Sequence, residues 1–293
     1  MKLLLGAGLY LAVAASAAAS TGAGSWSTPQ KIDDVAGNSA ELNTSSLDGC
    51  PILSPDGRSL YMASNRPGGV GGLDIWVAHR DSTDEPFDAP QNLTEINSPA
   101  NDFCPTPLRG RRLLFVSNRA TEQSCGMGDI YASRHNPKHG WATPRHLPCA
   151  PDGPNSELDE QGPSLVEIDG VEQLFFSRSA PPTVLGDLFV SPGFGPATTV
   201  AELNSAANDI QPNVRKDGRE VVFSSSRVSG NQDIYTATRA STNDPWSVPV
   251  AVDAVNTSAA ETRPSLSWDA HTLLFGRAPG EESALADIYI STR

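Results

Sequence analysis

The chain has 293 residues, with 34 acidic against 21 basic side chains and a net charge of −13, so it lacks the basic surface that nucleic acids and anionic membranes require. With 38% hydrophobic and 19% charged residues it can bury a core and is not disordered. Its 25 glycines and 24 prolines suit a β protein dense in turns and exclude a helical one.

The N-terminus has the pattern of an export signal. Lys2 precedes an apolar run from Leu3 to Ala15, and Ala15-Ser16-Ala17 and Ala17-Ala18-Ala19 both offer a small-x-small cleavage site. An uncleaved anchor is the alternative, but the run is short and rich in Ala, and no later stretch reaches about 20 apolar residues. We therefore expect residues 1–20 to be a signal peptide, no membrane insertion, and a periplasmic or secreted mature protein. The four cysteines fit such an oxidising compartment.

Residues 25–293 are expected to form one domain of five repeats with a period of about 54 residues. The repeats are marked by five prolines: Pro51, Pro105, Pro163, Pro212 and Pro264. Before each proline comes an Asn followed by Ser or Thr, at Asn43, Asn97, Asn155, Asn204 and Asn256, and then an acid, at Asp48, Asp102, Glu160, Asp209 and Glu261. After it come an Arg, at Arg66, Arg119, Arg178, Arg227 and Arg277, and an Asp, at Asp74, Asp129, Asp187, Asp233 and Asp287. The markers span residues 48–93, 102–147, 160–200, 209–252 and 261–293.

Each repeat is predicted to form four antiparallel strands, A to D, from the inside outward. Strand A follows the acid, as at Cys50 to Ser54, and an Asp-Gly turn such as Asp56-Gly57 supplies the positive φ of a tight hairpin; Asp269-Ala270 is the exception. Strand B is rich in β-formers, as in Leu113 to Val116, and strand C is the Asp-Ile-Tyr segment. Strand D is expected to carry a proline, which suits an outer edge, and one aromatic residue: Trp26, Phe87, Trp141, Phe194 or Trp246.

The two ends of the chain predict how the domain closes. The chain begins with a lone D strand at residues 25–32 and stops after a C strand at Ile288 to Arg293. Pairing the first strand into the last repeat completes the fifth set and leaves no open sheet edge. The sequence therefore predicts an all-β fold, a five-bladed β-propeller closed by its N-terminal strand.

The repeat resembles a known family. Leu53 to Tyr61, with Ser64-Asn65-Arg66 and Asp74-Ile75-Trp76 after it, is similar to the WD-like propeller repeat of TolB-type proteins. The second and fourth copies match nearly as well, whereas the fifth has Gly276 in place of the Ser. The resemblance covers essentially the whole mature chain and implies a periplasmic propeller that binds proteins. TolB also carries a separate N-terminal domain that is not expected here, so its particular role is not implied.

Charged residues are expected around the mouth of the central channel. Strand order places the D–A and B–C loops on one face, where the five acids enter strand A and the five arginines leave strand B. Two interpretations stay open: each Arg ties its own blade together by pairing with an acid, or the ring is a polar funnel for an anionic or polyhydroxyl ligand. The candidate binding residues on this face are Asp48, Asn65, Arg66, Asp102, Asn118, Arg119, Glu160, Arg178, Asp209, Arg227, Glu261 and Arg277.

Two further features of this face have simple interpretations. The Asn-Ser/Thr pairs are expected to cap the loops by satisfying backbone donors. The Gly-rich loop Pro67 to Gly72 lacks the Lys and helix of a nucleotide site, and we interpret it as a flexible lip of the channel.

The cysteines fall into two candidate disulfides under this fold. Cys125 and Cys149 lie in loops on the same face, and Cys50 and Cys104 occupy equivalent positions on neighbouring inner strands. Zinc is the rival, but Cys-x-x-Cys is absent. The five histidines are interpreted as surface residues: His79, His135, His139, His146 and His271. The sequence thus predicts no metal site.

For function, the sequence favours a non-catalytic binding or scaffold propeller that recognises an envelope protein or a glycan through its loop-rich face, as a monomer and without a cofactor. A Ca²⁺ ion in the channel would require the arginines to point away from the acids. The alternative is a glycosidase that uses funnel carboxylates such as Asp48, Asp102 or Glu160. Against it, every acid has an Arg in its own blade, which opposes the raised pKa of a general acid.

Overall fold

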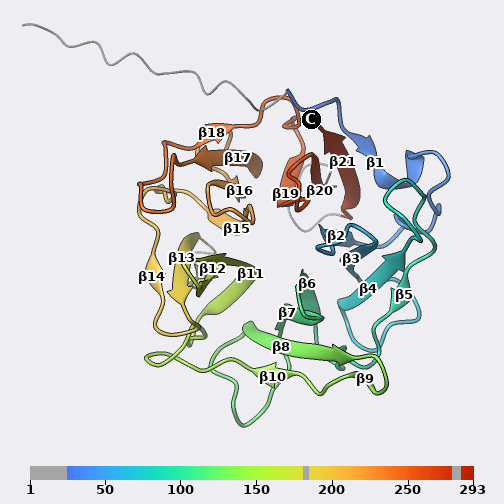
Figure 1. The fold of residues 1–293 in the computed structure, drawn as a ribbon, viewed down its shortest axis with the longest axis horizontal. Helices are drawn as coiled ribbons and strands as arrows, with labels where there is room; N and C mark the ends of the chain where they lie inside the picture. The colour runs from blue at the N-terminus through green and yellow to red at the C-terminus, as the bar shows by residue number, and fades with distance from the viewer. Residues whose placement is uncertain (1–24, 181–184, 279–284) are drawn as a thin grey trace, which may run out of the picture.

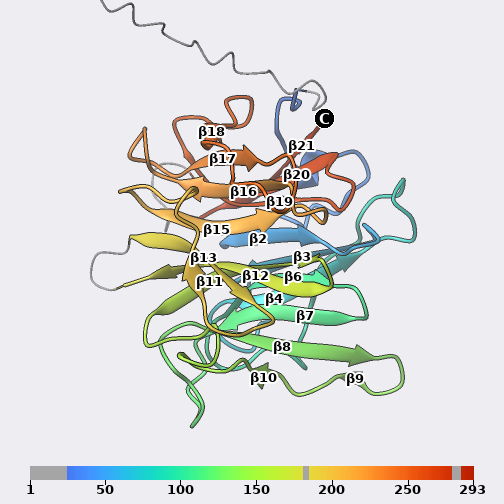
Figure 2. The ribbon, with the colours of Figure 1, turned by 60° about the vertical axis from the view of Figure 1, so that its left-hand side comes forward.

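The computed structural model describes residues 25–180, 185–278 and 285–293, and the predicted signal peptide lies outside these ranges. The described residues form five β-sheets around a central axis, with one edge strand of each sheet innermost (Figure 1). In the view turned by 60°, the blue and cyan strands of blade 1 and the green strands of blade 2 run across the molecule below the orange strands of blade 4 (Figure 2). The five-bladed propeller that the repeats predict is therefore confirmed.

Each blade has four strands in order from the axis outward, and blade 2 has one additional short strand. Blade 1 contains β2 (Asp48–Leu53), β3 (Ser59–Ser64), β4 (Asp74–His79) and β5 (Gln91–Asn92). Blade 2 contains β6 (Asp102–Leu108), β7 (Arg112–Ser117), β8 (Asp129–Asn136) and β10 (Arg145–His146), and β9 (Gly140–Trp141) also pairs with β8. Blade 3 contains β11 (Asp159–Ile168), β12 (Val171–Ser179), β13 (Gly186–Pro192) and β14 (Thr198–Thr199). Blade 4 contains β15 (Asp209–Val214), β16 (Glu220–Ser225), β17 (Asp233–Thr238) and β18 (Val250–Ala251). Blade 5 contains β19 (Ala260–Leu266), β20 (Thr272–Ala278), β21 (Asp287–Thr292) and β1 (Gln30–Lys31).

The N-terminal strand closes the ring, as predicted. β1 pairs antiparallel with β21, in the register Gln30 with Ile290 and Lys31 with Tyr289. The backbone N–H of Ser27 adds a hydrogen bond of 2.7 Å to the carbonyl of Thr292. A short 3₁₀ helix, η1 (Ile32–Asp34), follows, and Ile32 is buried in the core of the first blade. The first described segment thus completes the last blade and packs against the first one.

The outermost strands differ from the prediction. Each D strand has only two residues and begins after the aromatic residue and the proline rather than containing them. The reason is that proline has no N–H to donate to the neighbouring strand, so pairing in blade 1 starts at Gln91, directly after Pro90. The aromatic side chains serve the core instead, since Phe87 and Trp246 are buried.

Every inner strand contains a β-bulge at the proline that marks the repeat. The residue before each proline has a positive φ: Cys50 at 48°, Cys104 at 47°, Gly162 at 58°, Gln211 at 55° and Arg263 at 57°. A bulge bends its strand and re-aims side chains. In this fold the five bulges line a cavity on the axis.

In four blades the core contains a stacked pair of aromatic rings from strands B and C, and in blade 1 Met62 pairs with Trp76 at the same position. In blade 2 the pair is Phe115 and Tyr131, whose ring centroids lie 5.9 Å apart, and in blade 5 it is Phe275 and Tyr289, also at 5.9 Å. The A–B turns have the backbone that the sequence predicts, including the exception, because Ala270 has a φ of 61°. The hydrophobic strands therefore bury their side chains between blades and leave the loops to form the two faces.

Candidate functional site

The B–C and D–A loops meet on one face, as the strand order predicts, and they interlock between neighbouring blades. A Cβ on Gly71 would lie 2.1 Å from the carbonyl oxygen of Ala100, and a Cβ on Gly126 would lie 2.1 Å from that of Leu158. The Gly-rich loop is therefore not the free lip that we expected. Its glycines allow the backbone to approach the next blade closely.

The five acids and five arginines of the repeat form an ion pair within each blade. The nitrogen–oxygen distances are 2.5 Å for Arg66–Asp48, 2.6 Å for Arg119–Asp102, 2.7 Å for Arg178–Glu160, 2.6 Å for Arg227–Asp209 and 2.7 Å for Arg277–Glu261. All five carboxylates have 0% exposure. Of the two interpretations left open, this geometry supports the one in which each Arg ties its own blade together.

Each carboxylate also accepts two hydrogen bonds from the Ser or Thr that stands four residues before it in the D–A loop. In blade 4 the Ser205 backbone N–H and hydroxyl donate to Asp209 at 2.6 and 2.7 Å, and Ser225 donates at 2.5 Å. Thr44, Ser98, Ser156 and Thr257 make the same two contacts in the other blades. These hydrogen bonds stabilise the ionised carboxylate within a buried network.

Each arginine also covers the strand C aromatic ring of its blade. The guanidinium of Arg277 lies 4.4 Å from the ring centroid of Tyr289, and that of Arg119 lies 5.0 Å from that of Tyr131. Each guanidinium donates as well to a carbonyl of the D–A loop, for example from Arg227 to Leu203 at 2.6 Å. The repeated arginine therefore joins core, inner strand and loop in every blade.

The Asn of the repeat has the capping role that the sequence predicts. Asn97 accepts a hydrogen bond from the N–H of Ile75 at 2.9 Å and donates to the carbonyl of the same residue at 3.0 Å. The equivalent bonds are made by Asn43, Asn155, Asn204 and Asn256. Two further candidates fasten loops: Asn65 accepts from Leu47 at 2.9 Å, and Asn118 donates to Met127 at 2.6 Å.

One of the buried acids has a perturbed pKa. Burial raises the pKa of Glu160 above its ordinary value, although the Ser156 hydroxyl and the Arg178 guanidinium oppose the shift. The arginine thus opposes a raised pKa, as the sequence argument holds, but it does not prevent one at this residue. The side chain is nevertheless enclosed by its own blade, so the raised pKa by itself gives no access to a substrate.

The axis of the propeller is too narrow for a ligand of ordinary size. The cavity between the five bulges holds about 40 Å³, against several hundred Å³ for a typical small-molecule site. The Cys50–Cys104 disulfide, with a Cα–Cα distance of 4.9 Å, lines it and joins blades 1 and 2. The second predicted pair, Cys125–Cys149, is also bonded, with a Cα–Cα distance of 5.9 Å.

Sequence reasoning missed a ring of apolar side chains on the loop face, which we call the apolar rim. Among the described residues, each B–C loop exposes one large hydrophobic residue two to five positions before the Asp of strand C. The exposed fractions are 43% for Val70, 64% for Met127, 50% for Leu185, 83% for Val228 and 59% for Leu285. An aliphatic or thioether side chain in every B–C loop was the available signal. It was hidden because the spacing to the Asp varies with loop length.

The charges on this face are of one sign. Among the described B–C and D–A loops, every Lys or Arg is one of the five arginines already held in the blades. Exposed acids such as Glu122, Glu157 and Asp187 stand beside the apolar rim. The opposite face carries basic hairpins, among them Arg109 to Arg112 and Arg215 to Arg219. The loop face is thus apolar and acidic.

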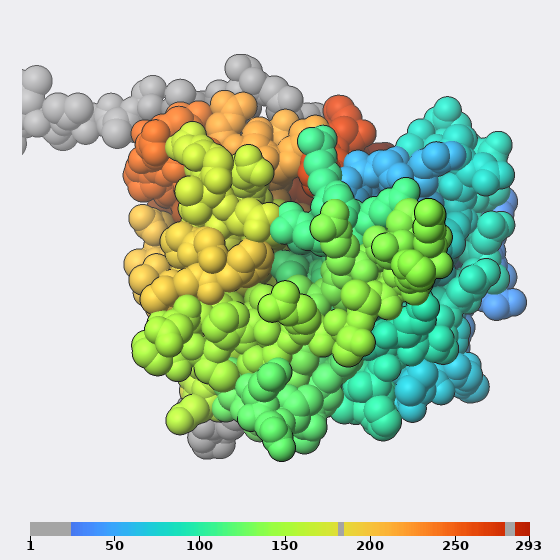
Figure 3. Space-filling view, turned by 60° about the horizontal axis from the view of Figure 1, so that its bottom comes forward, coloured from blue at the N-terminus to red at the C-terminus, as the bar shows by residue number. Residues whose placement is uncertain are grey.

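Figure 3 shows the surface of blade 2 in green, between blade 1 in cyan and blade 3 in yellow. On the turn side, a groove of about 610 Å³ lies between blades 1 and 2 and is lined by Tyr61, His79 and Trp141. Burial raises the pKa of Tyr61 to about 12, so its phenol stays neutral at ordinary pH. Among the described residues, the structure has no helix with the length and apolarity that a bilayer crossing needs.

The sequence matches no family model and none of the curated proteins. Several solved structures share the fold. The catalytic domain of a GH62 α-L-arabinofuranosidase from Coprinopsis cinerea matches with a TM-score of 0.58 at 14% identity, over 92% of this chain and 96% of that one. A GH43 endo-arabinanase from Bacillus licheniformis matches with a TM-score of 0.54 at 13% identity, over 85% and 94% of the chains. A protein assigned as a TolB from Agrobacterium tumefaciens gives 0.49 at 16% identity, over 82% and 73%. These identities show the propeller fold alone.

Proposed function

We propose that the protein is an exported, non-catalytic propeller of the TolB type that docks a protein partner on its loop face. The observation that carries the proposal is the apolar rim, to which every blade contributes one exposed aliphatic or thioether side chain. The five side chains lie on the face formed by the B–C loops, and exposed apolar surface bordered by polar residues is typical of protein interaction sites. Export is supported by the leader pattern in residues 1–20.

The chemistry of the rim defines the kind of partner. Val70, Leu185 and Leu285 are aliphatic, and glycan sites stack sugars on aromatic rings instead, so the rim favours a protein. The exposed acids beside the rim favour a partner whose apolar patch is flanked by Lys or Arg. Electrostatic steering toward a chain of net charge −13 would make the association rate fall with salt.

The carboxylates argue against the glycosidase alternative, although its propellers share the fold. Hydrolysis of a glycosidic bond needs two carboxyl groups that reach the substrate. Here the five funnel acids have 0% exposure, and each is engaged by an arginine and a hydroxyl of its own blade. Glu160, whose pKa is raised, is as enclosed as the others. We therefore expect no turnover of arabinan oligosaccharides by the purified protein. Turnover that disappears in Glu160→Gln would favour the enzyme.

The proposal is tested by comparing two matched variants in capture experiments. The rim variant replaces Val70, Met127, Leu185, Val228 and Leu285 by Ser. The control variant replaces by Ser the other large hydrophobics that are exposed in the described ranges, Val171, Val248 and Val250, which lie in blades 3 and 4 away from the B–C loops. Each protein is immobilised and exposed to envelope extract, and captured proteins are quantified by mass spectrometry. A protein retained by wild type and control but lost by the rim variant supports the proposal. Equal retention by all three contradicts it.

A further inference from the structure

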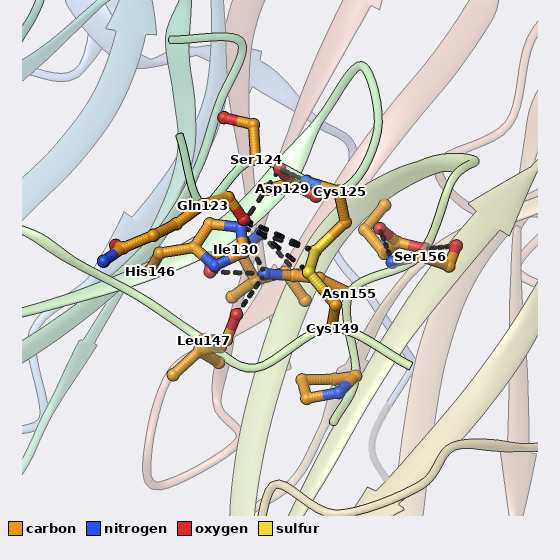
Figure 4. The surroundings of a disulfide bond; sticks show 12 residues. Gln123, Ser124, Cys125, Asp129, Ile130, His146, Leu147, Cys149, Asn155 and Ser156 are labelled. Atoms are coloured by element: carbon orange, nitrogen blue, oxygen red, sulfur yellow. Dashed lines mark hydrogen bonds and ion pairs between the residues drawn. A yellow bond between two sulfur atoms is a disulfide. The ribbon is translucent and has the colours of Figure 1, made fainter. Parts of the chain in front are cut away.

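The two disulfides have different surroundings, and the one at the loop face lies in a cluster of further donor atoms. Cys125 belongs to the B–C loop of blade 2, and Cys149 to the following D–A loop. Figure 4 shows the imidazole of His146 beside the two sulfur atoms, with Asp129 on the other side of the ring nitrogen. The side chain of His146 is only 6% exposed, so the expectation that all five histidines lie at the surface is wrong for this one.

The donor atoms lie close enough together to share one metal ion. Cys125 Sγ is 3.7 Å from His146 Nε2, and both sulfurs and this nitrogen lie within 4.8 Å of one another. In a tetrahedral zinc site with bonds of about 2.0 to 2.3 Å, neighbouring ligand atoms are roughly 3 to 4 Å apart. The backbone therefore already places three ligands at nearly the right separation, and the two sulfurs need only part when the disulfide opens.

Asp129 lies beside these donor atoms and, in the described part of the chain, has one carboxylate oxygen without a partner. Its side chain is 2% exposed, and Oδ2 lies 3.1 Å from His146 Nε2 and accepts the Cys125 N–H at 2.9 Å. Its other oxygen, Oδ1, is buried without a hydrogen-bond partner among the described residues. A buried carboxylate oxygen without a partner is costly, and a cation would satisfy it.

His146 sets blade 2 apart from the other blades. The residue that pairs with the strand C aromatic is Asn92 in blade 1, His146 in blade 2, Thr199 in blade 3, Ala251 in blade 4 and Lys31 in blade 5. In blade 1 the amide of Asn92 donates to Asp74 at 3.1 Å, which satisfies that carboxylate without a metal. The imidazole occurs where the two cysteines are, so this cluster is not explained by the repeat.

We propose that the reduced form of the Cys125–Cys149 pair binds one Zn²⁺ through both sulfurs and His146 Nε2, with the Asp129 carboxylate completing the coordination. A dithiol donor breaks the S–S bond by delivering two electrons and two protons, and itself becomes a disulfide. Zinc then displaces the two thiol protons into solvent, and the imidazole binds as a neutral ring with its proton on Nδ1. Two thiolates and an imidazole are ligands that zinc prefers. When the disulfide is reduced, a zinc ion bound by both loops thus replaces the covalent bond between them.

The experiment compares oxidised and reduced full-length mature protein. The protein is reduced with dithiothreitol, desalted without oxygen and titrated with Zn²⁺ in a calorimeter, and Co²⁺ is used as a spectroscopic substitute. We expect one Zn²⁺ per chain in the reduced protein, none in the oxidised protein, and sulfur-to-cobalt charge-transfer absorption. No zinc binding by the reduced wild-type protein would overturn the proposal.

Three variants test the assignment of the ligands. His146→Asn introduces the residue that blade 1 has at this position, so the blade should still fold, and it is expected to weaken zinc binding by about 100-fold or more. Asp129→Asn should weaken it by about 10- to 100-fold. Cys125→Ser/Cys149→Ser retains the dithiol of Cys50 and Cys104 but should bind no zinc. Unchanged affinity in His146→Asn, or binding to the Ser variant, contradicts the proposed site.

Discussion

The ring of ion pairs around the axis and the apolar rim lie on the same face but follow opposite rules. The ring repeats in all five blades, its carboxylates have 0% exposure, and its partners are the same in kind throughout. The members of the rim vary in residue type and in their distance from the Asp of strand C, and all of them are exposed. We infer that repeated residues hold the propeller together and that the varied ones contact the partner. The predictions below test this division.

The largest effect is expected from opening the ring. Deleting residues 25–32 removes β1, the partner of β21, and takes Ile32 out of the core. The loss of Ile32 alone costs about 2 to 5 kcal/mol, and the unpaired edge of blade 5 adds to this. Thermal and urea unfolding should show a large loss of stability. An unchanged melting curve would contradict the closure by the N-terminal strand.

Breaking one repeated ion pair should be nearly as damaging. Asp209→Ala leaves the Arg227 guanidinium without its carboxylate in a site where only 14% of that side chain is exposed. Removal of one partner of a buried pair costs about 3 to 5 kcal/mol. Glu122→Ala, at an exposed acid of the same face, is the control and should change stability by no more than about 0.5 kcal/mol. Similar urea midpoints for both variants would mean that the ring does not stabilise the blade.

The two disulfides should also differ in how much they stabilise the protein, with the larger contribution from the bond at the axis. Cys50–Cys104 joins residues 54 positions apart in adjacent blades, whereas Cys125–Cys149 spans 24. Because the longer loop loses more entropy when closed, Cys50→Ala/Cys104→Ala should cost about 3 to 4 kcal/mol, and Cys125→Ala/Cys149→Ala about half a kcal/mol less. Urea unfolding of the two double variants measures the difference. The opposite order would contradict the structural role of the axial bond.

The smallest effects concern pH. Burial raises the pKa of Asp159 on the loop face, whereas a hydrogen bond from the Ser54 hydroxyl lowers the pKa of Asp56 in an A–B turn. A carboxyl group whose pKa is higher in the folded than in the unfolded protein stabilises the fold fully at pH values below its unfolded pKa. This contribution to stability is lost as the pH rises through the folded pKa. A carboxyl group whose pKa is lower in the folded protein stabilises the fold at pH values above its unfolded pKa. This contribution is lost as the pH falls through the folded pKa.

Opposite pH profiles of two variants test these directions. Relative to wild type, Asp159→Asn should be more favourable at about pH 7 than at about pH 3, because it removes a charge whose burial is unfavourable. Asp56→Asn should be destabilising at about pH 7, and the effect should fade in acid as wild-type Asp56 is protonated. Urea unfolding at several pH values gives both profiles. Parallel profiles would show that the two carboxyl groups do not differ in this way.

The sequence predicted the fold because five copies of the same markers repeat at a nearly constant spacing, and the strand count at the ends requires closure. It also predicted the role of the Asn caps and both candidate disulfides. It did not predict that the outer strands begin after the proline, since that depends on which backbone N–H groups face strand C. The rim was hidden because Val70 and Met127 stand at different distances from Asp74 and Asp129.

The metal cluster was hidden for another reason. Strands β8 and β9 and the turn between them separate Cys125 from His146 in the sequence. Only the pairing of β10 with β8 brings the imidazole to Asp129. Zinc motifs are recognised in sequences by short spacings between ligands. The four side chains come from two loops and two strands. The one short spacing between sulfur and nitrogen ligands, from His146 to Cys149, stands alone, so the structure was needed to find the cluster.

The division between ring and rim is tested most directly by hydrogen exchange of the protein alone and in complex with the captured partner. The account predicts that binding slows exchange in the B–C loops at residues 67–73, 120–128 and 226–232 and leaves the A–B hairpins at 55–58, 109–112 and 215–219 unchanged. Protection confined to the hairpins, with the B–C loops unaffected, would show that the partner binds the opposite face and that the apolar rim is not its docking surface.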